Sequence, residues 1–410
     1  MGCLKSDMKS EKLERYCDVI SGYAFKSTDW RDSGVPVVKI GNISNGNDII
    51  FDEQIQYVEE EFKNKIDSKY LICKGDILLS LTGSHINQPN SMVGRCCQNR
   101  QNKLYFLNQR AGKVIPFSSV DKSYLYYLLS TKEIKCAIAN KAYGGANQVN
   151  ISPRDIKNIR WTFPRLEIQQ RIASILSAYD DLIENNNKRI KILEKMAENL
   201  YKEWFVRFRF PGREKIKMKE CTPSGWVVSS RQACMQCPEH WNYGALHHLN
   251  SFKRGKNITA AEMVEGVIPV ISAGIEPSGY HCSYNVEGKS LTISSSGANA
   301  GYLQCHFTSI WAADCSYCQD KNQLWFIFNA LKFLQPVISN MQVGSAQPHV
   351  YPKHINKLCT ILPNEELIAK YCKMVEPIYE QISILQEKNK NLTKQRDKLL
   401  PRLMSGKLEV

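Results

Sequence analysis

Two polar segments, each placed directly after an apolar run, carry side chains suited to reading the edges of DNA bases. They are SLTGSHINQ at residues 80–88 and SSSGAN at residues 294–299. Asn and Gln can contact adenine through two hydrogen bonds, while Ser and His adapt to donors or acceptors. Turn formation explains such loops equally well, so both interpretations stay open. The candidate base-contacting residues are Thr82, Ser84, His85, Asn87, Gln88, Asn147, Gln148, Ser296, Asn299, Gln347 and His349.

The net charge favours a polyanionic partner. The chain of 410 residues has 54 Lys and Arg against 40 Asp and Glu, which gives a net charge of +14. Each Lys or Arg set against a phosphate releases a counterion, so we expect binding to double-stranded DNA, although a charge that serves solubility would look the same. Phosphate contacts position a protein without specifying a sequence. The candidate phosphate contacts are Lys26, Lys39, Lys253, Arg254 and Lys256.

The sequence lacks the common signatures of catalysis. It has no G-x-x-x-x-G-K-[ST] phosphate loop, no glycine-rich dinucleotide turn, no H-E-x-x-H zinc motif and no G-x-S-x-G nucleophile turn. We therefore predict a binding protein without catalytic residues, and a dyad assembled from distant residues stays open.

Fifteen cysteines raise the question of a metal site. The C-x-x-C pairs Cys234/Cys237 and Cys315/Cys318 are much farther apart than the roughly 15–20 residues typical of a zinc ribbon. The N-terminus lacks an export signal and no run of about 18 apolar residues exists, so we expect a cytoplasmic protein without a membrane span. We also expect no metal and reduced cysteines throughout.

The chain contains an internal duplication. Gly22, Pro36 and Gly41 have counterparts 233 positions later, and residues 144–164 align with residues 343–363 at an offset of 199. Repeats of this length indicate duplication of a whole domain plus helix rather than a solenoid. Because the stretches between the anchors differ in length, the two copies share a scaffold and carry different inserts.

Short apolar runs punctuated by Gly, Asn and Pro predict an α+β fold with two duplicated mixed α/β domains. We expect a turn at residues 45–48, one helix over residues 124–139, and a strand followed by a helix within residues 322–341. The expected strands lie within residues 35–43, 70–81, 158–163, 266–274 and 290–297.

Two segments carry a heptad pattern of apolar residues, which is typical of a coiled coil. Each helix needs a partner for this face, and its own duplicate is free to pack against it antiparallel; the alternative is a surface helix packed on each domain. Asn186 and Asn389 interrupt the seams, and a buried Asn specifies register at a cost in stability. The predicted seam consists of Ile172, Leu176, Tyr179, Ile183, Asn186, Ile190, Leu193, Leu200, Tyr371, Val375, Ile378, Ile382, Leu385, Asn389, Leu392 and Leu399.

These patterns predict a linear domain organisation. About 40 residues per helix give a rod of roughly 60 Å, or some 18 base pairs of DNA. A basic connector follows the first helix and either contacts phosphate or stays a solvated linker. The predicted limits are 1–163 for the first recognition domain, 164–208 for the first spacer helix, 209–363 for the second recognition domain with its basic linker 209–223, and 364–410 for the second spacer helix and tail.

In these features the chain resembles the specificity subunits of type I restriction–modification systems. The resemblance covers nearly the whole length and is carried by KGDIL at residues 74–78, by NQRAG at residues 108–112 and above all by the junction where Phe163-Pro164 leads into QQRIA at residues 169–173. The corresponding junction at residues 363–369, PNEELIA, lacks the Gln-Gln-Arg.

The resemblance implies a division of labour in a complex. Two target recognition domains would each contact one half of a split, asymmetric DNA sequence, and the helices would set the spacing and dock two modification subunits that bind S-adenosylmethionine and methylate adenine. Restriction subunits would add ATP- and Mg-dependent translocation and cleavage, with no cofactor in this chain. The alternatives are a duplicated-domain nuclease or zinc-dependent DNA-binding enzyme, and a coiled-coil scaffold for an acidic partner.

Overall fold

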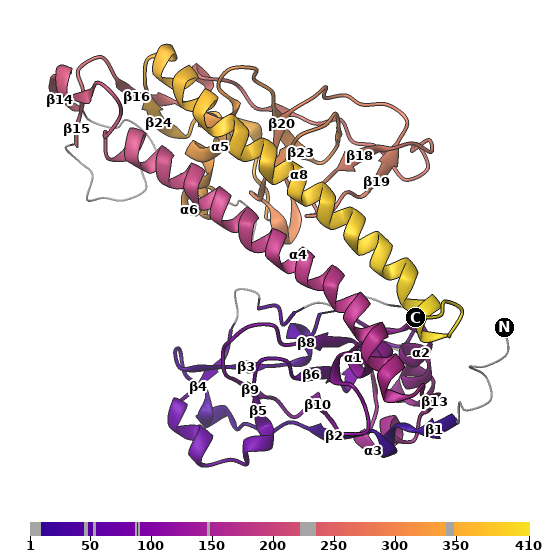
Figure 1. Cartoon of the computed structure of the whole chain (residues 1–410). Coiled ribbons are helices and arrows are strands. Elements are labelled where there is room, and N and C mark those ends of the chain that lie inside the picture. The colour runs from indigo at the N-terminus through magenta and orange to yellow at the C-terminus, as the bar shows by residue number, and fades with distance from the viewer. Residues whose placement is uncertain are drawn as a thin grey trace. The chain divides into compact units, whose positions relative to one another are not determined.

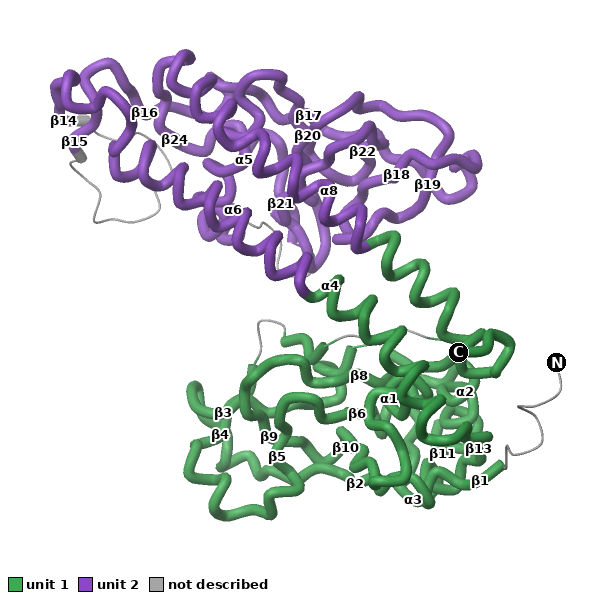
Figure 2. Tube along the Cα trace, viewed as in Figure 1, with its two compact units in different colours: residues 1–184, 390–410 green, residues 185–389 purple. Residues whose placement is uncertain are grey.

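The computed structural model describes residues 10–44, 48–51, 55–86, 88, 91–145, 148–221, 235–341 and 348–410. The chain forms two compact units, one of residues 1–184 with 390–410 and the other of residues 185–389 (Figure 2). Both units contain part of each long helix, α4 (Leu166–Tyr201) and α8 (Glu365–Met404). The domain limits expected from the sequence stay predictions.

The first unit is built on a four-stranded antiparallel sheet in the order β2-β10-β6-β8 (Figure 1). A second sheet has the order β4-β3-β9-β5, in which β3 and β9 are parallel. The first sheet contains β2 (Cys17–Ser21), β6 (Ile77–Ser80), β8 (Cys96–Gln98) and β10 (Ala111–Pro116). The second contains β3 (Val35–Val38), β4 (Tyr57–Val58), β5 (Leu71–Ile72) and β9 (Tyr105–Leu107).

Smaller elements complete the first unit. Thr131 ends α1 and also caps α2, because its hydroxyl accepts a hydrogen bond from the backbone N–H of Ile134. The single helix expected over residues 124–139 is therefore two helices, and that prediction was wrong at Thr131. The elements are β1 (Ser10–Lys12), β7 (Thr82–Gly83), α1 (Lys122–Ser130), α2 (Lys132–Lys141), β11 (Tyr143–Gly145), β12 (Gln148–Asn150), α3 (Pro153–Lys157) and β13 (Arg160–Thr162).

The second unit repeats this plan. Its four-stranded antiparallel sheet has the order β17-β23-β20-β21, and its three-stranded sheet β19-β18-β22 again contains one parallel pair, β18 with β22. The strands are β17 (Lys253–Arg254), β18 (Ile268–Ile271), β19 (Gly279–His281), β20 (Ser290–Ser294), β21 (Leu303–His306), β22 (Trp311–Ala312) and β23 (Cys315–Cys318). The duplication seen in the sequence is thus a duplication of sheet topology.

The other elements of the second unit include two helices at residues 322–341, where the sequence predicted a strand and a helix. That prediction was wrong because the run is buried on every side: residues 324–331 are all buried, so no period of 3.6 marks the helix. The elements are β14 (Met218–Cys221), β15 (Met235–Pro238), β16 (Asn242–Ala245), α5 (Leu324–Phe333), α6 (Gln335–Asn340), α7 (Pro352–Ile355) and β24 (Cys359–Leu362).

Within each unit the two long helices share the hydrophobic core. In the second unit Ala197 lies opposite Tyr371, whose hydroxyl donates to the Ala197 carbonyl at 3.2 Å, while Asn186 lies opposite Asn389. Residue numbers rise along one helix as they fall along the other, so the pair is antiparallel. In the first unit Ile172 and Leu176 of α4 share a core with Leu403 of α8. The predicted α+β fold with duplicated domains and two helices packed antiparallel is confirmed.

The turn expected at residues 45–48 falls mostly on residues 45–47, which lie outside the described part of the chain. Cys237 is disulfide-bonded, so the expectation of reduced cysteines throughout was wrong at this position. The free cysteines include both members of the second C-x-x-C pair, Cys315 and Cys318.

Candidate nucleic-acid interface

In the first unit the predicted polar loop begins where β6 ends. Thr82 is buried, and its hydroxyl donates to Oδ1 of Asn150 on β12 at 2.7 Å. The Ser84 hydroxyl donates to the carbonyl oxygen of Gln88 at 2.7 Å and accepts from the Ser91 hydroxyl at 3.0 Å. These bonds hold the loop in one shape. The hydroxyls of Thr82 and Ser84 therefore stabilise the conformation of the loop.

Other candidates of the first unit lie around this loop or away from it. His85 is half-buried in the loop, while Gln88 and Gln148 are exposed. The Lys39 ammonium lies 5.1 Å from the centre of the Trp30 ring, and Lys26 is exposed next to a short helical turn. Asn87 and Asn147 lie outside the described residues.

In the second unit three predicted residues come together at the ends of β17 and β20. Nη2 of Arg254 donates to Oδ1 of Asp314 at 2.6 Å, and the Ser296 hydroxyl donates to Oδ2 of the same carboxylate. Ser296 also forms an antiparallel bridge with His349. Arg254 and Ser296, which are distant in sequence, therefore share one carboxylate, and His349 lies beside Ser296.

The remaining candidates of the second unit are sequence neighbours of Arg254, Ser296 or His349. The His349 ring stacks on Tyr351, with ring centres 5.8 Å apart and an angle of 12° between the planes. Lys253 and Lys256 are exposed on either side of Arg254, and Asn299 lies in a short helical turn after Ser296. Gln347 lies outside the described residues.

The two units share the hydrogen-bonded frame around these residues. In the first, the N–H of Leu81 donates to the carbonyl of Arg110, and the N–H of Ile151 donates to the carbonyl of Leu81. In the second, the N–H of Ser295 donates to the backbone carbonyl of Asp314, and the N–H of Val350 donates to the carbonyl of Ser295. The frame therefore pairs positions between the units: Thr82 with Ser296, Asn150 with His349, Arg110 with Asp314, and Ser21 with Arg254.

Sequence reasoning missed four of these positions: Ser21, Asn150, Arg110 and Asp314. The offset of 199 that relates Pro153 to Pro352 also relates Asn150 to His349, so the repeat could have identified Asn150. Arg110 and Asp314 are separated by 204 positions, an offset that neither set of anchors shows. Only the register of the strands brings them to equivalent places.

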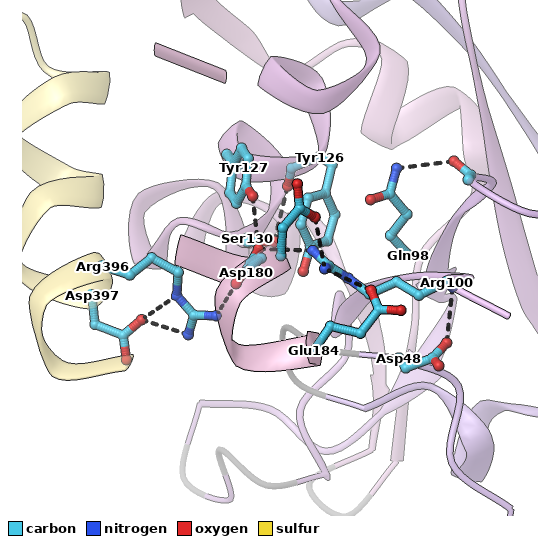
Figure 3. A network of polar contacts seen from close by, with 12 residues as sticks. Asp48, Gln98, Arg100, Tyr126, Tyr127, Ser130, Asp180, Glu184, Arg396 and Asp397 are labelled. Carbon is cyan, nitrogen blue, oxygen red and sulfur yellow. Dashed lines mark hydrogen bonds and ion pairs between the residues drawn. The ribbon is translucent and has the colours of Figure 1, made fainter. Parts of the chain in front are cut away.

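The helix pair of the first unit is joined to the rest of that unit by a buried ionic network centred on Asp180. The side chains of Tyr127, Arg100 and Arg396 converge on Asp180, which is 5% exposed (Figure 3). Its carboxylate accepts from the Tyr127 hydroxyl at 2.7 Å, from Nη2 of Arg100 at 2.9 Å and from Nη1 of Arg396 at 2.5 Å. Burial alone lowers the pKa of Arg396, but pairing with Asp180 and Asp397 outweighs it, and the pKa lies above its ordinary value.

All predicted seam residues are buried or half-buried. In the second unit Ile190, Val375, Ile382 and Leu385 lie in one core, and Leu193, Leu200 and Ile378 pack against it. In the first unit Ile172 and Leu176 lie in the core and Leu399 packs against it.

The start of α4 contains the residue with which the junction motif begins. Gln169 is 1% exposed; its Nε2 donates to the carbonyl of Pro164 at 2.8 Å, and its Oε1 accepts from the backbone N–H of Asp121 at 3.0 Å. The side chain thereby joins the strand exit, the new helix and α1. The same position in the second copy is Ile368, which is buried in the core.

No grouping of three or more His, Cys, Asp or Glu that could hold a metal ion occurs among the described residues. Burial raises the pKa of the Cys315 and Cys318 thiols to about 12, and both thiols are free. No helix in the described part of the chain combines the length and apolar character that crossing a membrane requires.

Comparison with known proteins agrees with this arrangement. Residues 5–195 and 238–394 match the family described as type I restriction modification DNA specificity domain. The MjaIX specificity subunit of the type I restriction enzyme of Methanocaldococcus jannaschii is 29% identical over 320 residues, which cover 74% of this chain and 73% of that protein. The HindI specificity subunit of Haemophilus influenzae is 23% identical over 425 residues, covering 83% and 88%.

Among solved structures, the crystal structure of the type I restriction–modification system S subunit from M. genitalium has the same fold. It aligns with a TM-score of 0.58 and 20% identity and covers 98% of this chain and 97% of that chain. The duplicated sheets, the antiparallel helices and the family match over both halves agree with one another. The chain therefore belongs to the type I restriction–modification DNA specificity family.

Proposed function

We propose that this specificity subunit reads a bipartite, asymmetric DNA target, with one half assigned to each unit. The observation that carries the proposal is the shared frame with different side chains. Equivalent positions hold Thr82, Asn150 and Arg110 in the first unit, and Ser296, His349 and Asp314 in the second. A shared backbone frame with exchanged polar groups is what two related readers of different base sequences require.

The two long helices would set the distance between the half-sites and dock the modification subunits. The docking part of the proposal is supported by exposed apolar residues on the helix pair. In the second unit Ile192 and Met196 of α4 are 61% and 52% exposed, and Met374 and Ile384 of α8 are each 49% exposed. Exposed apolar side chains of this size mark interaction surfaces when they gather on one face.

Heptad positions place these four residues on one face of the pair. On each helix they occupy the two positions that flank the same side of the seam, and in an antiparallel pair these sides meet. The opposite side of the pair carries the recognition domain: Tyr379 packs on Trp325 at 4.1 Å between ring centres, and Glu376 accepts from Lys289. The exposed face is therefore free for the helices of a partner.

The proposal assigns the chemistry to other chains. S-adenosylmethionine would bind to two modification subunits, and ATP and Mg to restriction subunits, with no cofactor or catalytic residue in this chain and with DNA in the cytoplasm as the target. The lack of the common catalytic motifs in the sequence supports this division.

The test is an exchange of recognition domains. Residues 1–163 are replaced by the corresponding segment of another family member of known target, and methylated adenines are mapped by single-molecule sequencing in cells that also produce the modification subunits. The proposal expects one half-site to change and the other, with the gap between them, to stay. An unchanged methylation motif, or the replacement of both halves, would refute it.

A further inference from the structure

The ion pair between Arg254 and Asp314 is positioned by backbone on both sides. Arg254 ends β17 and lies opposite Ser316 on β23, and Asp314 directly precedes β23. The next residue, Gly255, donates its N–H to the carbonyl of Cys315 at 2.8 Å. A Cβ at Gly255 would lie 2.3 Å from the carbonyl oxygen of Ala313, so only glycine permits this close approach.

The pair is accessible yet ordered by its contacts. The side chain of Arg254 is 41% exposed and that of Asp314 is 24% exposed. Both carboxylate oxygens are used, because Oδ1 accepts from Arg254 and Oδ2 accepts from Ser296. The guanidinium has five N–H donors, and the bond from Nη2 to the carboxylate leaves others for a ligand.

The carboxylate of Asp314 also bears on which part of the DNA Arg254 contacts. Asp314 lies at hydrogen-bond distance from Arg254. A DNA phosphate that approached Arg254 would therefore be repelled by the negative charge of Asp314. The major-groove edge of guanine presents two neutral acceptors, O6 and N7, at the spacing that a guanidinium matches. The sequence had suggested a phosphate contact for Arg254, and the position of Asp314 favours the base edge instead.

We propose that Arg254 is a specificity-determining residue that reads a guanine in the half-site of the second unit, and that Asp314 is the positioning residue that holds its guanidinium in the reading geometry. The inference rests on the proposed bipartite function. Ser296 supports the arrangement through the second carboxylate oxygen. The equivalent places in the first unit hold Ser21 and Arg110, so the first half-site is read by a different set.

The test uses the complete complex of this chain with its modification subunits. The methylated motif is mapped first; competition binding is then measured with duplexes in which each base pair of the target is changed in turn. Arg254→Ala should lower discrimination at one G·C pair of the second half-site by roughly 5- to 150-fold, the range of one bidentate contact, and leave the first half-site intact. Asp314→Asn should weaken discrimination at the same base pair, and Asp314→Glu should restore most of it.

A matched control is available in the same unit. The Asp320 carboxylate accepts from Asn250 and from the backbone N–H groups of Asn322 and Gln323. Asp320→Asn removes the same charge and a structural bond, so a loss of discrimination shared by Asp320→Asn and Asp314→Asn would overturn the positioning role.

Other outcomes distinguish a failure of the inference about Arg254 from a failure of the proposed bipartite function. A uniform loss of affinity in Arg254→Ala across all duplexes, with a salt dependence lowered by about one ion, would show a phosphate contact and overturn the inference while the bipartite function stands. A change confined to the first half-site would overturn it as well. A wild-type complex without any bipartite motif would instead contradict the proposed function itself.

Discussion

Asn186 and Asn389 meet across the helix pair of the second unit, where Nδ2 of Asn186 donates to Oδ1 of Asn389 at 2.8 Å. Nδ2 of Asn389 in turn donates to Oδ1 of Asn187 at 2.8 Å. Both seam asparagines are half-buried. An amide that finds its partner in only one register penalises every shifted pairing, so this contact stabilises one alignment of α4 and α8 over the others.

Replacing one asparagine should cost more than replacing both. Asn186→Leu leaves the Oδ1 of Asn389 without its donor in a half-buried seam, and we expect a loss of about 1–2 kcal/mol in the free energy of unfolding. The double variant Asn186→Leu, Asn389→Leu removes both polar groups and should regain most of that loss. Urea unfolding of the two single variants and the double variant measures the coupling; additive effects would contradict a direct contact.

Asp180 should be the most sensitive acidic residue of the first unit. Removing its charge leaves Arg100 and Arg396 partly buried without their shared partner, so Asp180→Ala should destabilise the unit by about 3–5 kcal/mol. The neighbouring Asp181 is 76% exposed, and Asp181→Ala should change stability by less than about 0.5 kcal/mol. Thermal unfolding of both variants checks the difference, and similar losses would contradict a dominant role for the buried Asp180 carboxylate.

His306 should make the stability of the second unit depend on pH. Burial lowers its pKa to about 4, and Nε2 lies 2.8 Å from the Thr292 hydroxyl. The unfolded chain binds this proton near pH 6.5, so the contribution is complete above about pH 6.5 and is lost as the pH falls towards 4.

The full contribution is about 3 kcal/mol, from a pKa difference of roughly 2.5 units. His306→Gln, which keeps a polar side chain beside Thr292, should therefore lose less stability than the wild type between pH 7 and pH 4.5 in urea unfolding. The exposed His240 gives the control, since His240→Gln should follow the wild-type curve. A wild type and His306→Gln with parallel pH curves would contradict the prediction.

The exposed apolar face of the helix pair should matter for assembly and not for folding. Ile192→Glu together with Ile384→Glu places charges where a partner helix would pack, and we expect loss of co-purification with the modification subunits at unchanged thermal stability. The control is Lys191→Glu, one position away on α4 and exposed, which lies off this face. Intact complexes with the double variant would mean that the partners dock elsewhere.

Periodic patterns in the sequence were sufficient for the helix pair. The seven-residue spacing of seam residues such as Leu176, Ile190 and Val375 follows from the geometry of two packed helices, so the residues and their burial can be read from the sequence. The same rule failed for α5, because a helix buried on all sides has no polar face to reveal its period.

The candidate site was only partly predictable for a different reason. Loop composition pointed to Ser296 and His349, but the pairing of Arg254 with Asp314 depends on the register between β17 and β23. Register is set by contacts between distant segments, which residue types within one loop do not encode. The acidic partner is the reason that we propose a base contact for Arg254 in place of the phosphate contact expected from the sequence.

The most direct test of the whole account changes the helices and leaves both readers untouched. One heptad is inserted next to Asn186 and one next to Asn389, which lengthens the pair by roughly 10 Å at 1.5 Å per residue, or about three base pairs. Mapping of methylated adenines should then show both half-sites unchanged and the gap between them widened by two to three base pairs, roughly the added length. A motif with the original gap, at intact assembly and methylation, would contradict the claim that the helix pair sets the spacing between two independent readers.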